Sequence, residues 1–262
     1  MKLEFLGTGA ADWNIQKRTD ADTEWRRFSS TLVDGTLLID PGPHIFDYAE
    51  KTNQPHLFDN VTDIIITHSH QDHFNCQNTL KLCAGGRNCR VWGDIANLRK
   101  LNRTLGENMT VDFRPVTPGK KFYAGGYAII PTPANHETTD MDEITLNYII
   151  SRNGQKMFYG LDTGWLPTEA WRYVKKRKFD CMVLELTMGD IVPGDFRIFS
   201  HTSIPMLEIM LQTFRAQGCL SDDSKVIVSH LARYLHTDHA STVKRLAPLG
   251  VDVAYDGLTY EF

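Results

Sequence analysis

Three histidines and an aspartate lie within six positions of the segment THSHQDH, residues 67–73. Imidazoles this close together would repel one another on protonation, and each would need a polar partner if buried. Imidazole and carboxylate are also the groups with which proteins bind zinc and related divalent metals. The HxHxDH spacing, which places His68, His70, Asp72 and His73 together, therefore predicts a metal site.

Three more residues of the same types follow apolar runs farther along the chain. His136 comes after YAIIPTPAN, Asp162 ends KMFYGLD and His230 ends KVIVSH. Side chains just past the ends of several strands meet at one edge of a sheet, where α/β proteins usually bind ligands. We therefore expect one shared site. Asp40 ends TLLID in the same way, and we expect it to orient a ligand histidine rather than to bind metal.

The number of candidate ligands fits two metal ions better than one. Five imidazoles and two carboxylates exceed the three protein ligands that a catalytic zinc ordinarily keeps beside its water. If Asp162 gives one oxygen to each ion, two cations roughly 3.5 to 4 Å apart can share a water and make it a nucleophile at neutral pH. This is hydrolase chemistry. The predicted metal ligands are His68, His70, Asp72, His73, His136, Asp162 and His230.

The elements that must position these residues alternate between short strands and helices. Strands are predicted at 2–7, 36–40, 63–67, 89–93, 127–131, 144–150, 156–161, 181–186, 225–229 and 251–255. Helices are predicted at 44–51, 75–83, 94–104, 167–177, 204–217 and 238–247. This alternation predicts a layered α/β fold. Because no linker or repeat is visible, we expect one domain over residues 1–262.

Composition excludes several classes of protein. A formal net charge of −4 over 262 residues disfavours long nucleic acids as partners. The basic run KKRK, residues 175–178, is expected to be the solvated end of a helix. The five cysteines are scattered and lack a CxxC pair, which predicts reduced thiols and a cytoplasmic location. The N-terminus does not have the pattern of a signal peptide, and no apolar stretch reaches the roughly eighteen residues of a membrane span.

With these motifs the chain resembles the metallo-β-lactamase superfamily over nearly its whole length. The HxHxDH segment, the lone His136, the Asp162 of GLDTG and the His230 of VSHL follow the order of that superfamily's motifs. The resemblance implies an α/β fold of four layers, the αββα metallo-β-lactamase sandwich, with the site along one edge. It also implies two divalent ions, zinc or manganese, with iron also accepted. The implied first ligand set is His68, His70, His136 and Asp162, and the second is Asp72, His73, Asp162 and His230.

Within the superfamily the chain is most similar to the PhnP-like phosphodiesterase branch, the relatives of ribonuclease Z. The similarity lies in the opening LGTGAAD, in SHTSI at 200–204 and in the closing VAYDGLTYEF, although residues 11–29 lack the cysteines that bind a structural zinc in PhnP. Two-zinc lactamases commonly carry a cysteine at the position of Asp162, and a carboxylate suits phosphate chemistry better. By this resemblance His201 protonates or stabilises the leaving oxygen, and His201 and Asp72 are the predicted catalytic residues.

The expected substrate is a small cyclic or nucleotide-like phosphodiester, attacked by a hydroxide that bridges the metals. A lactonase or thioesterase that uses the same dimetal site remains the alternative. Ribonuclease Z grips transfer RNA with a long arm rich in glycine and proline, and the chain has no insertion of that kind. This favours a small molecule over structured RNA.

Several residues allow two interpretations. Glu185 either supports a ligand or is a satisfied core carboxylate, and Asn135 either orients His136 or forms a turn. The irregular segment 11–29 contains Trp13, Trp25, Arg26 and Arg27, which would form either a wall that stacks on a base or the contact of a homodimer. Surface or structural positions are expected for His44, His56, His236 and His239, and packing positions for Trp165, Trp171 and Tyr173.

Overall fold

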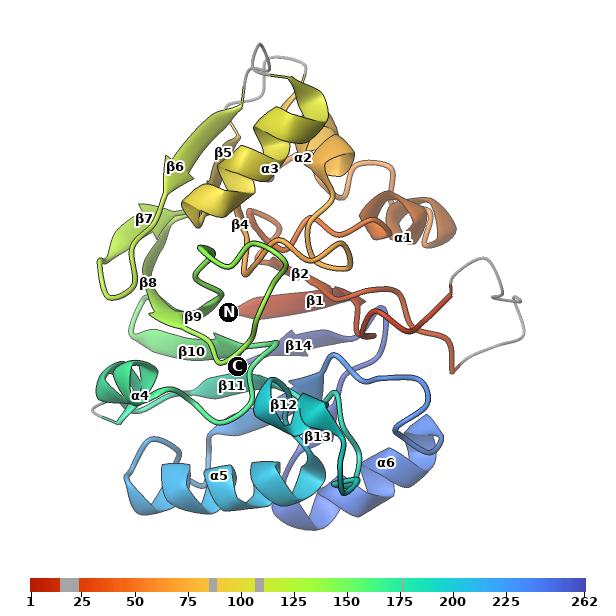
Figure 1. Cartoon of the computed structure of the whole chain (residues 1–262), viewed down its shortest axis with the longest axis vertical. Helices are drawn as coiled ribbons and strands as arrows, with labels where there is room; N and C mark the ends of the chain where they lie inside the picture. Colours follow the sequence, from red (N-terminus) through yellow and green to blue (C-terminus); the bar gives the residue numbers. More distant parts are fainter. Residues whose placement is uncertain (15–23, 85–88, 107–110, 176) are drawn as a thin grey trace.

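Two β-sheets, each covered by helices on its outer face, form the frame of the molecule (Figure 1). The computed structural model describes residues 1–14, 24–84, 89–106, 111–175 and 177–262. Within these ranges each sheet has seven strands, in the orders β14-β1-β2-β3-β4-β5-β6 and β13-β12-β11-β10-β9-β8-β7.

The first sheet contains β1 (Lys2–Gly7), β2 (Ser30–Val33), β3 (Leu37–Ile39), β4 (Asp63–Ile65), β5 (Arg90–Gly93), β6 (Asp112–Pro115) and β14 (Thr259–Glu261). The second contains β7 (Phe122–Ala124), β8 (Tyr127–Pro133), β9 (Leu146–Arg152), β10 (Gln155–Gly160), β11 (Cys181–Glu185), β12 (Lys225–Ser229) and β13 (Asp252–Val253). The helices are α1 (Ile45–Lys51), α2 (Cys76–Cys83), α3 (Ile95–Leu105), α4 (Thr168–Val174), α5 (Ile204–Ala216) and α6 (His239–Leu246), with the 3₁₀ helices η2 (Phe196–Phe199) and η3 (Ala247–Leu249).

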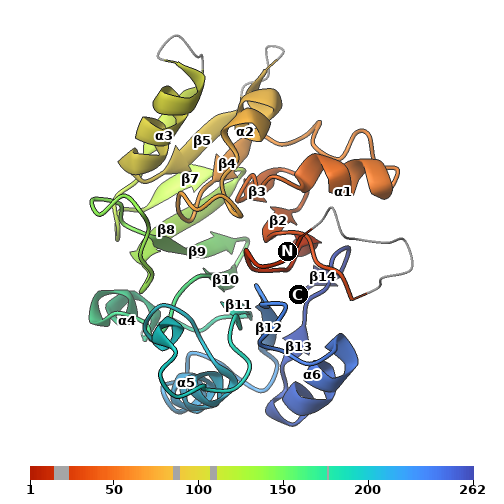
Figure 2. The ribbon, with the colours of Figure 1, turned by 45° about the vertical axis from the view of Figure 1, so that its right-hand side comes forward.

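Three buried clusters hold the four layers together. Successive residues of a strand belong to different clusters. In β4, Ile65 belongs to the cluster between the two sheets, whereas Ile64 belongs to the cluster between the first sheet and its helices. In the second sheet Val183 likewise faces inward and Met182 faces the helices. Burial on both faces explains why the strands appear in the sequence as continuous apolar runs. Figures 1 and 2 show α1–α3 on one outer side and α4–α6 on the other, and the predicted αββα sandwich is confirmed.

Within each sheet, the strands that precede the candidate ligands run in one direction, and the residues that follow them meet at one edge. β3 and β4 are parallel, and so are β10, β11 and β12. Polar contacts join the two sheets at this edge, where the backbone N–H of Leu146 donates to the carbonyl of Thr67 at 2.9 Å and the hydroxyl of Tyr148 donates to the carbonyl of Ile66 at 2.6 Å. Loops from both sheets therefore meet at one place.

Most predicted elements are found, with small differences at their ends. The described strands β2, β6, β7 and β14 lie outside the predicted runs. β6 and β14 are edge strands with mostly exposed polar residues, which carry little apolar signal. The helix predicted at 167–177 ends at Val174, and residue 176 of the basic run lies outside the described residues. Among the described residues, no helix has the length and apolar character that crossing a membrane requires.

Candidate metal centre

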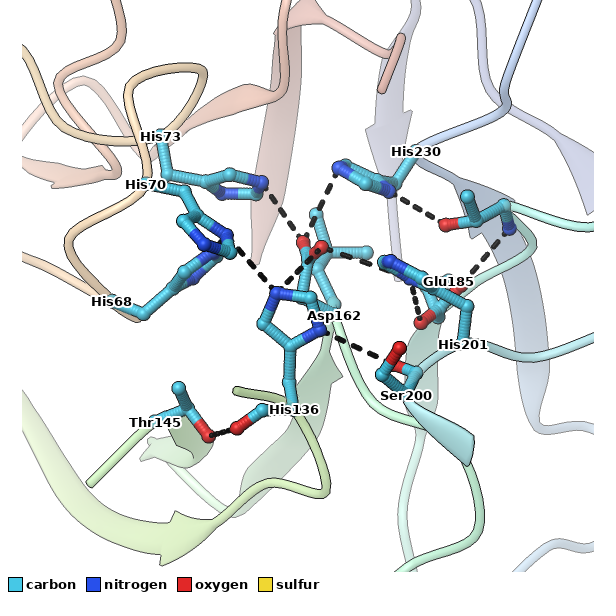
Figure 3. A network of polar contacts seen from close by, with 12 residues as sticks. His68, His70, His73, His136, Thr145, Asp162, Glu185, Ser200, His201 and His230 are labelled. Atoms are coloured by element: carbon cyan, nitrogen blue, oxygen red, sulfur yellow. Dashed lines mark hydrogen bonds and ion pairs between the residues drawn. The ribbon is translucent and has the colours of Figure 1, made fainter. Parts of the chain in front are cut away.

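The predicted ligands meet where the two sheets join, and Figure 3 shows the imidazoles gathered around Asp162. In a first group, Nε2 of His68 lies 3.0 Å from Nδ1 of His70, which lies 3.1 Å from Nε2 of His136. Nitrogen ligands about 2.0 to 2.1 Å from a tetrahedral zinc lie roughly 3.3 Å from one another. The spacing of the three nitrogens therefore suits one such ion.

A second group lies on the other side of Asp162. Oδ2 of Asp72 lies 3.6 Å from Nε2 of His73 and 3.4 Å from Nε2 of His230. Asp162 places Oδ2 at 2.8 Å from Nε2 of His73 and 3.3 Å from Nε2 of His230, while its Oδ1 lies 3.8 Å from Nε2 of His136. One carboxylate thus faces both groups, with one oxygen toward each.

The centre contains buried polar atoms that the protein does not satisfy. Nε2 of His73 and Oδ2 of Asp162 are buried and lie 2.8 Å apart, yet neither makes a hydrogen bond of ordinary geometry. Unsatisfied buried polar atoms are rare in folded proteins and need an explanation. Because imidazole and carboxylate are the ligands of divalent transition metals, the donor set fits a cation between the two groups.

Backbone and side-chain contacts fix the orientation of the ligand rings. Asp40 accepts hydrogen bonds from the backbone N–H of Thr67 at 2.7 Å and from its hydroxyl at 2.8 Å. The same carboxylate lies 2.8 Å from Nδ1 of His73, and the Thr67 hydroxyl lies 3.0 Å from Nδ1 of His68. With Nδ1 engaged, Nε2 of each ring faces the centre. Asp40 thus orients a histidine, as expected, and Thr67 orients another.

Two further rings, those of His136 and His230, are held in a similar way by residues that the sequence did not indicate. Nδ1 of His136 lies 3.3 Å from the carbonyl of Ser200, and because a carbonyl only accepts, this nitrogen donates and leaves Nε2 unprotonated. Nδ1 of His230 lies 2.8 Å from the hydroxyl of Thr187. Both contacts turn Nε2 toward Asp162. A backbone carbonyl leaves no side-chain signal in a sequence, so Ser200 was not predictable.

Electrostatics keep several groups in the form that binds a metal. Burial lowers the pKa of His136 to about 4 and, with the neighbouring His73, holds the pKa of His68 well below its ordinary value. Burial opposes the charge of Asp162, but His230 and His73 hold the pKa of this carboxyl well below its usual range. Neutral His68 and His136 beside an ionised carboxylate are the protonation states that metal binding requires. Burial opposes the charge of His73, but Asp162 and Asp72 raise the pKa of this ring well above its ordinary value, so His73 would release a proton when a metal binds.

Three residues at the ends of strands have left-handed backbone conformations. The φ angles are 60° at Asp40, 48° at Asp162 and 60° at His230. This region costs free energy in residues other than glycine and persists where the surroundings enforce it, commonly at functional sites. At all three positions the chain turns immediately after or within two residues of a strand, and the turn directs the side chain into the centre.

His201 lies beside the centre in the loop before α5, as the sequence predicted. Its Nδ1 is 3.0 Å from Oε1 of Glu185 and 3.9 Å from Oδ1 of Asp162. Burial opposes the charged ring, but Glu185 and Asp162 raise the pKa of His201 to about 9. Glu185 also accepts the backbone N–H groups of Thr163 and Thr187 at 2.8 and 2.9 Å, so this buried carboxylate supports the centre.

A set of contacts fixes the HxHxDH loop to its neighbours. The hydroxyl of Ser69 donates to Glu143, which also accepts from the amide of Asn97 at 3.0 Å. The ammonium of Lys100 donates to the carbonyl of Ser69. Ser69 thus links the loop to α3 and to the loop that follows His136. Only the three-dimensional contacts reveal this role, because Glu143 and Lys100 are far from Ser69 in sequence.

Three of the four side chains expected in the wall of segment 11–29 lie inside the molecule. Trp25, Arg26 and Arg27 are buried. Arg26 donates to the Thr8 hydroxyl at 2.7 Å, and Arg27 donates to the carboxylate of Asp47 at 2.7 Å. These three buried side chains offer no stacking surface, whereas Trp13 is half-buried and donates its indole N–H to the carbonyl of Leu231 at 2.7 Å. Residues 15–23 lie outside the described residues.

The remaining candidates lie apart from the centre or play other roles. Asn135 holds its loop through its backbone, whose N–H donates to the Thr163 hydroxyl at 2.9 Å. Trp165 is 44% exposed, so its predicted packing role is wrong, whereas Trp171 and Tyr173 pack against the core as expected. The other histidines have structural contacts away from the ligands: His44 with Phe28, His56 with Asp59, His236 with Leu186 and His239 with Arg26.

Comparisons with known proteins agree with this architecture. A model of the beta-lactamase superfamily domain matches residues 36–230. A diphosphatase of the PhnP family has a TM-score of 0.76 and 19% identity, over 100% of this chain and 97% of that chain. Zinc-bound PqqB from Methylobacterium extorquens has a TM-score of 0.73 and 16% sequence identity, over 100% of both chains. The short form of human tRNase Z has a TM-score of 0.70 and 17% identity, over 100% of this chain and 99% of that chain.

No protein in a search of curated proteins matches this chain. At these identities the solved structures show a shared fold. The family model covers most of the chain and ends at the last predicted ligand, His230. The chain belongs to the metallo-β-lactamase superfamily, and its buried histidines and aspartates form a cluster consistent with the metal site of a hydrolase with this fold.

Proposed function

We propose that the protein is a dinuclear metal-dependent phosphodiesterase that acts on a small cyclic or nucleotide-like phosphodiester. The single observation that carries the phosphodiester assignment is the contact of His201 with Glu185 at 3.0 Å, next to Asp162. A buried carboxylate orients the imidazole and favours its charged form, as a donor to a leaving oxygen requires. An alkoxide that leaves phosphorus is a poor leaving group and gains most from such a donor.

The two groups of donors would hold one cation each, with Asp162 between them. The first cation would take His68, His70, His136 and one oxygen of Asp162, and the second would take Asp72, His73, His230 and the other oxygen. Zinc, manganese or iron in these positions would supply an activated water and neutralise charge on the phosphoryl oxygens. PqqB from Methylobacterium extorquens, which shares the fold, binds zinc, and this supports zinc as one candidate.

The cavity above the donors suits a small anionic substrate. It has a volume of about 530 Å³, and its lining includes, besides several predicted ligands, the cationic Lys100 and Arg197 and the acidic Asp12. Arg197 is paired with Asp195, whereas Lys100 donates to the backbone carbonyls of Ser69 and Phe74 and would attract an anion toward the donors. The diphosphatase of the PhnP family, which shares the fold, also works on a phosphoryl group, and this supports the same class of substrate. With its net negative charge, the chain is better suited to a small diester in the cytoplasm than to long nucleic acid.

Metal content tests the first part of the proposal. Protein purified without chelator should contain about two equivalents of zinc, manganese or iron per chain by elemental analysis, and Asp162→Ala should lose both the metal and turnover. Asp63→Ala is a matched control because Asp63 is a buried carboxylate at the start of β4, away from the centre. A wild-type protein that retains no transition metal would refute the dinuclear assignment.

Leaving-group dependence tests the role of His201. His201→Ala should lower kcat roughly 100-fold or more for a diester with an alkoxide leaving group and much less for bis(p-nitrophenyl) phosphate, whose leaving group needs no proton. A parallel assay with a 2′,3′-cyclic nucleotide, a lactone and a thioester separates phosphorus from carbonyl chemistry. Faster turnover of the lactone or thioester than of every diester would favour the alternative function.

A further inference from the structure

A second cavity of about 440 Å³ lies next to the catalytic cavity, and His136 lines both. Its wall is formed by Asn135 and Glu137 on one loop and by Phe196, Phe199 and Ser200 on another. A group bound there would therefore lie next to His136, one of the predicted metal ligands. The position suits one end of a substrate whose other end is held at the donors.

Two aromatic side chains of this wall are strongly exposed. Phe196 is 71% exposed and Phe199 is 73% exposed. Both belong to the 3₁₀ helix η2, in which residues three apart eclipse one another and so project from the same side. Large apolar side chains grouped beside a functional cavity commonly mark a binding surface. The pair offers flat apolar surface at the mouth of the cavity.

The cavity lies on the side of the centre where the leaving group departs in the proposed reaction. Nδ1 of His136 contacts the carbonyl of Ser200, and the next residue, His201, has its ring centroid 4.8 Å from that of His136 (Figure 3). A leaving oxygen that receives a proton from His201 is therefore close to this wall. The rest of the leaving group would extend past His136 toward the two phenylalanines.

We propose that this cavity is the binding subsite for a nucleobase on the leaving group of the substrate, an inference that rests on the proposed phosphodiesterase function. Phe196 and Phe199 stack on the base, and the wall also presents groups that hydrogen-bond to its edge. The exposed amide of Asn135 offers a donor and an acceptor, and the carboxylate of Glu137 accepts from an exocyclic amino group. A purely aliphatic leaving group would use the apolar surface but none of these polar groups.

Binding measured by calorimetry tests the subsite without turnover. Adenosine 5′-monophosphate, ribose 5-phosphate and adenosine are titrated into the metal-loaded protein, so that the first two ligands differ only in the base. We expect wild type to bind the nucleotide more tightly than ribose 5-phosphate. The double variant Phe196→Ala/Phe199→Ala should lose at least about fivefold in affinity for the nucleotide, as expected for the loss of base stacking, and should bind ribose 5-phosphate unchanged.

Tyr123→Ala is the matched control. Tyr123 is 67% exposed and pairs with Ala128 at the start of β8, the end opposite the centre, so this substitution should change no affinity. Equal affinity of wild type for the nucleotide and ribose 5-phosphate would overturn the subsite, as would an equal loss for both ligands in the double variant. Adenosine separates the two proposals: if it binds in a manner that depends on the phenylalanines while neither phosphate binds, the subsite stands and the phosphodiesterase assignment fails. A dimer that the double variant dissociates, without any change in ligand affinity, would also overturn the subsite.

Discussion

Oε1 of Glu185 lies 3.0 Å from Nδ1 of His201, and the same buried carboxylate accepts the backbone N–H groups of Thr163 and Thr187. Thr163 follows Asp162 directly, and the hydroxyl of Thr187 contacts His230. One carboxylate at the end of β11 thus connects the predicted proton donor with the segments that carry two predicted ligands.

Glu185→Gln should separate these two roles. The amide keeps the size of the side chain but removes the charge that favours the protonated imidazole, so kcat for a diester with a poor leaving group should fall roughly 10- to 100-fold. Turnover of bis(p-nitrophenyl) phosphate should fall much less. Steady-state assays on the two substrates, together with metal analysis, check this. A variant that loses metal, or loses activity equally on both substrates, would show that Glu185 acts on the architecture of the site alone.

Asp40→Asn should weaken metal binding while it preserves the backbone. Asparagine tolerates the left-handed conformation at this position, where φ is 60°, but it cannot replace both acceptor oxygens that serve Thr67 and His73. Loss of such a contact to a metal-binding histidine typically lowers metal affinity about 10- to 100-fold. Competition with a chromogenic chelator measures the affinity.

Asp63→Asn is the control for that measurement. Asp63 is also fully buried and accepts the indole N–H of Trp92 at 2.8 Å, but it lies at the other end of the adjacent strand β4. The Asp63→Asn variant should have a lower free energy of unfolding than wild type and a metal affinity near that of wild type. Equal metal affinities of the Asp40 and Asp63 variants would contradict the orienting role of Asp40.

That the candidate ligands lie together was predictable because each follows a recognisable apolar run. Buried strands leave a continuous apolar signal, and a histidine or aspartate at the end of such a run, as at Asp162 and His230, stands out from it. The groups that orient those ligands were harder to predict. The group of Ser200 that contacts His136 is its backbone carbonyl, which every residue type has. The contact between Ser69 and Glu143 joins residues 74 positions apart. Nothing local in the sequence marks either one.

Two sequence-based predictions differ from the structure, one for the position of Arg26 and one for strand β2. Arg26 was expected at the surface because a charge in an irregular segment is usually solvated, but it donates to the carbonyl of Ala254 at 2.6 Å, 228 positions away. β2 was missed although a hairpin signal was present. Three residues, 34–36, connect it to β3, and the backbone N–H of Thr36 donates to the carbonyl of Val33 at 3.0 Å. The φ angles of 46° at Asp34 and 69° at Gly35 are those of the left-handed turn that this dipeptide favours.

Ser69→Ala should loosen the loop that carries His68 and His70. The hydroxyl that is lost donates to Glu143, and a single hydrogen bond contributes about 1 kcal/mol, so metal affinity should fall roughly fivefold. Ser224→Ala removes a comparable bond, 2.7 Å to the carbonyl of Phe179, in the loop before β12 and serves as control. Metal competition on both variants measures the difference. A loss of affinity in the Ser224 variant as large as that in the Ser69 variant would contradict a local effect.

Removal of metal should destabilise the protein in a manner that depends on Asp162. Without a cation, the carboxylates of Asp72 and Asp162 and the ring of His73 remain buried next to one another with unsatisfied atoms. A metal present at about a thousand times its Kd adds about 4 kcal/mol to the free energy of unfolding. For a chain of this size the loss corresponds to a fall in Tm of about 8 to 16 °C, measurable by calorimetry before and after chelation. Asp162→Asn should begin with a lower Tm and show little further fall with chelator, because it holds little metal to lose. An equal fall in Tm on chelation of wild type and this variant would place the stabilising ion outside the proposed centre.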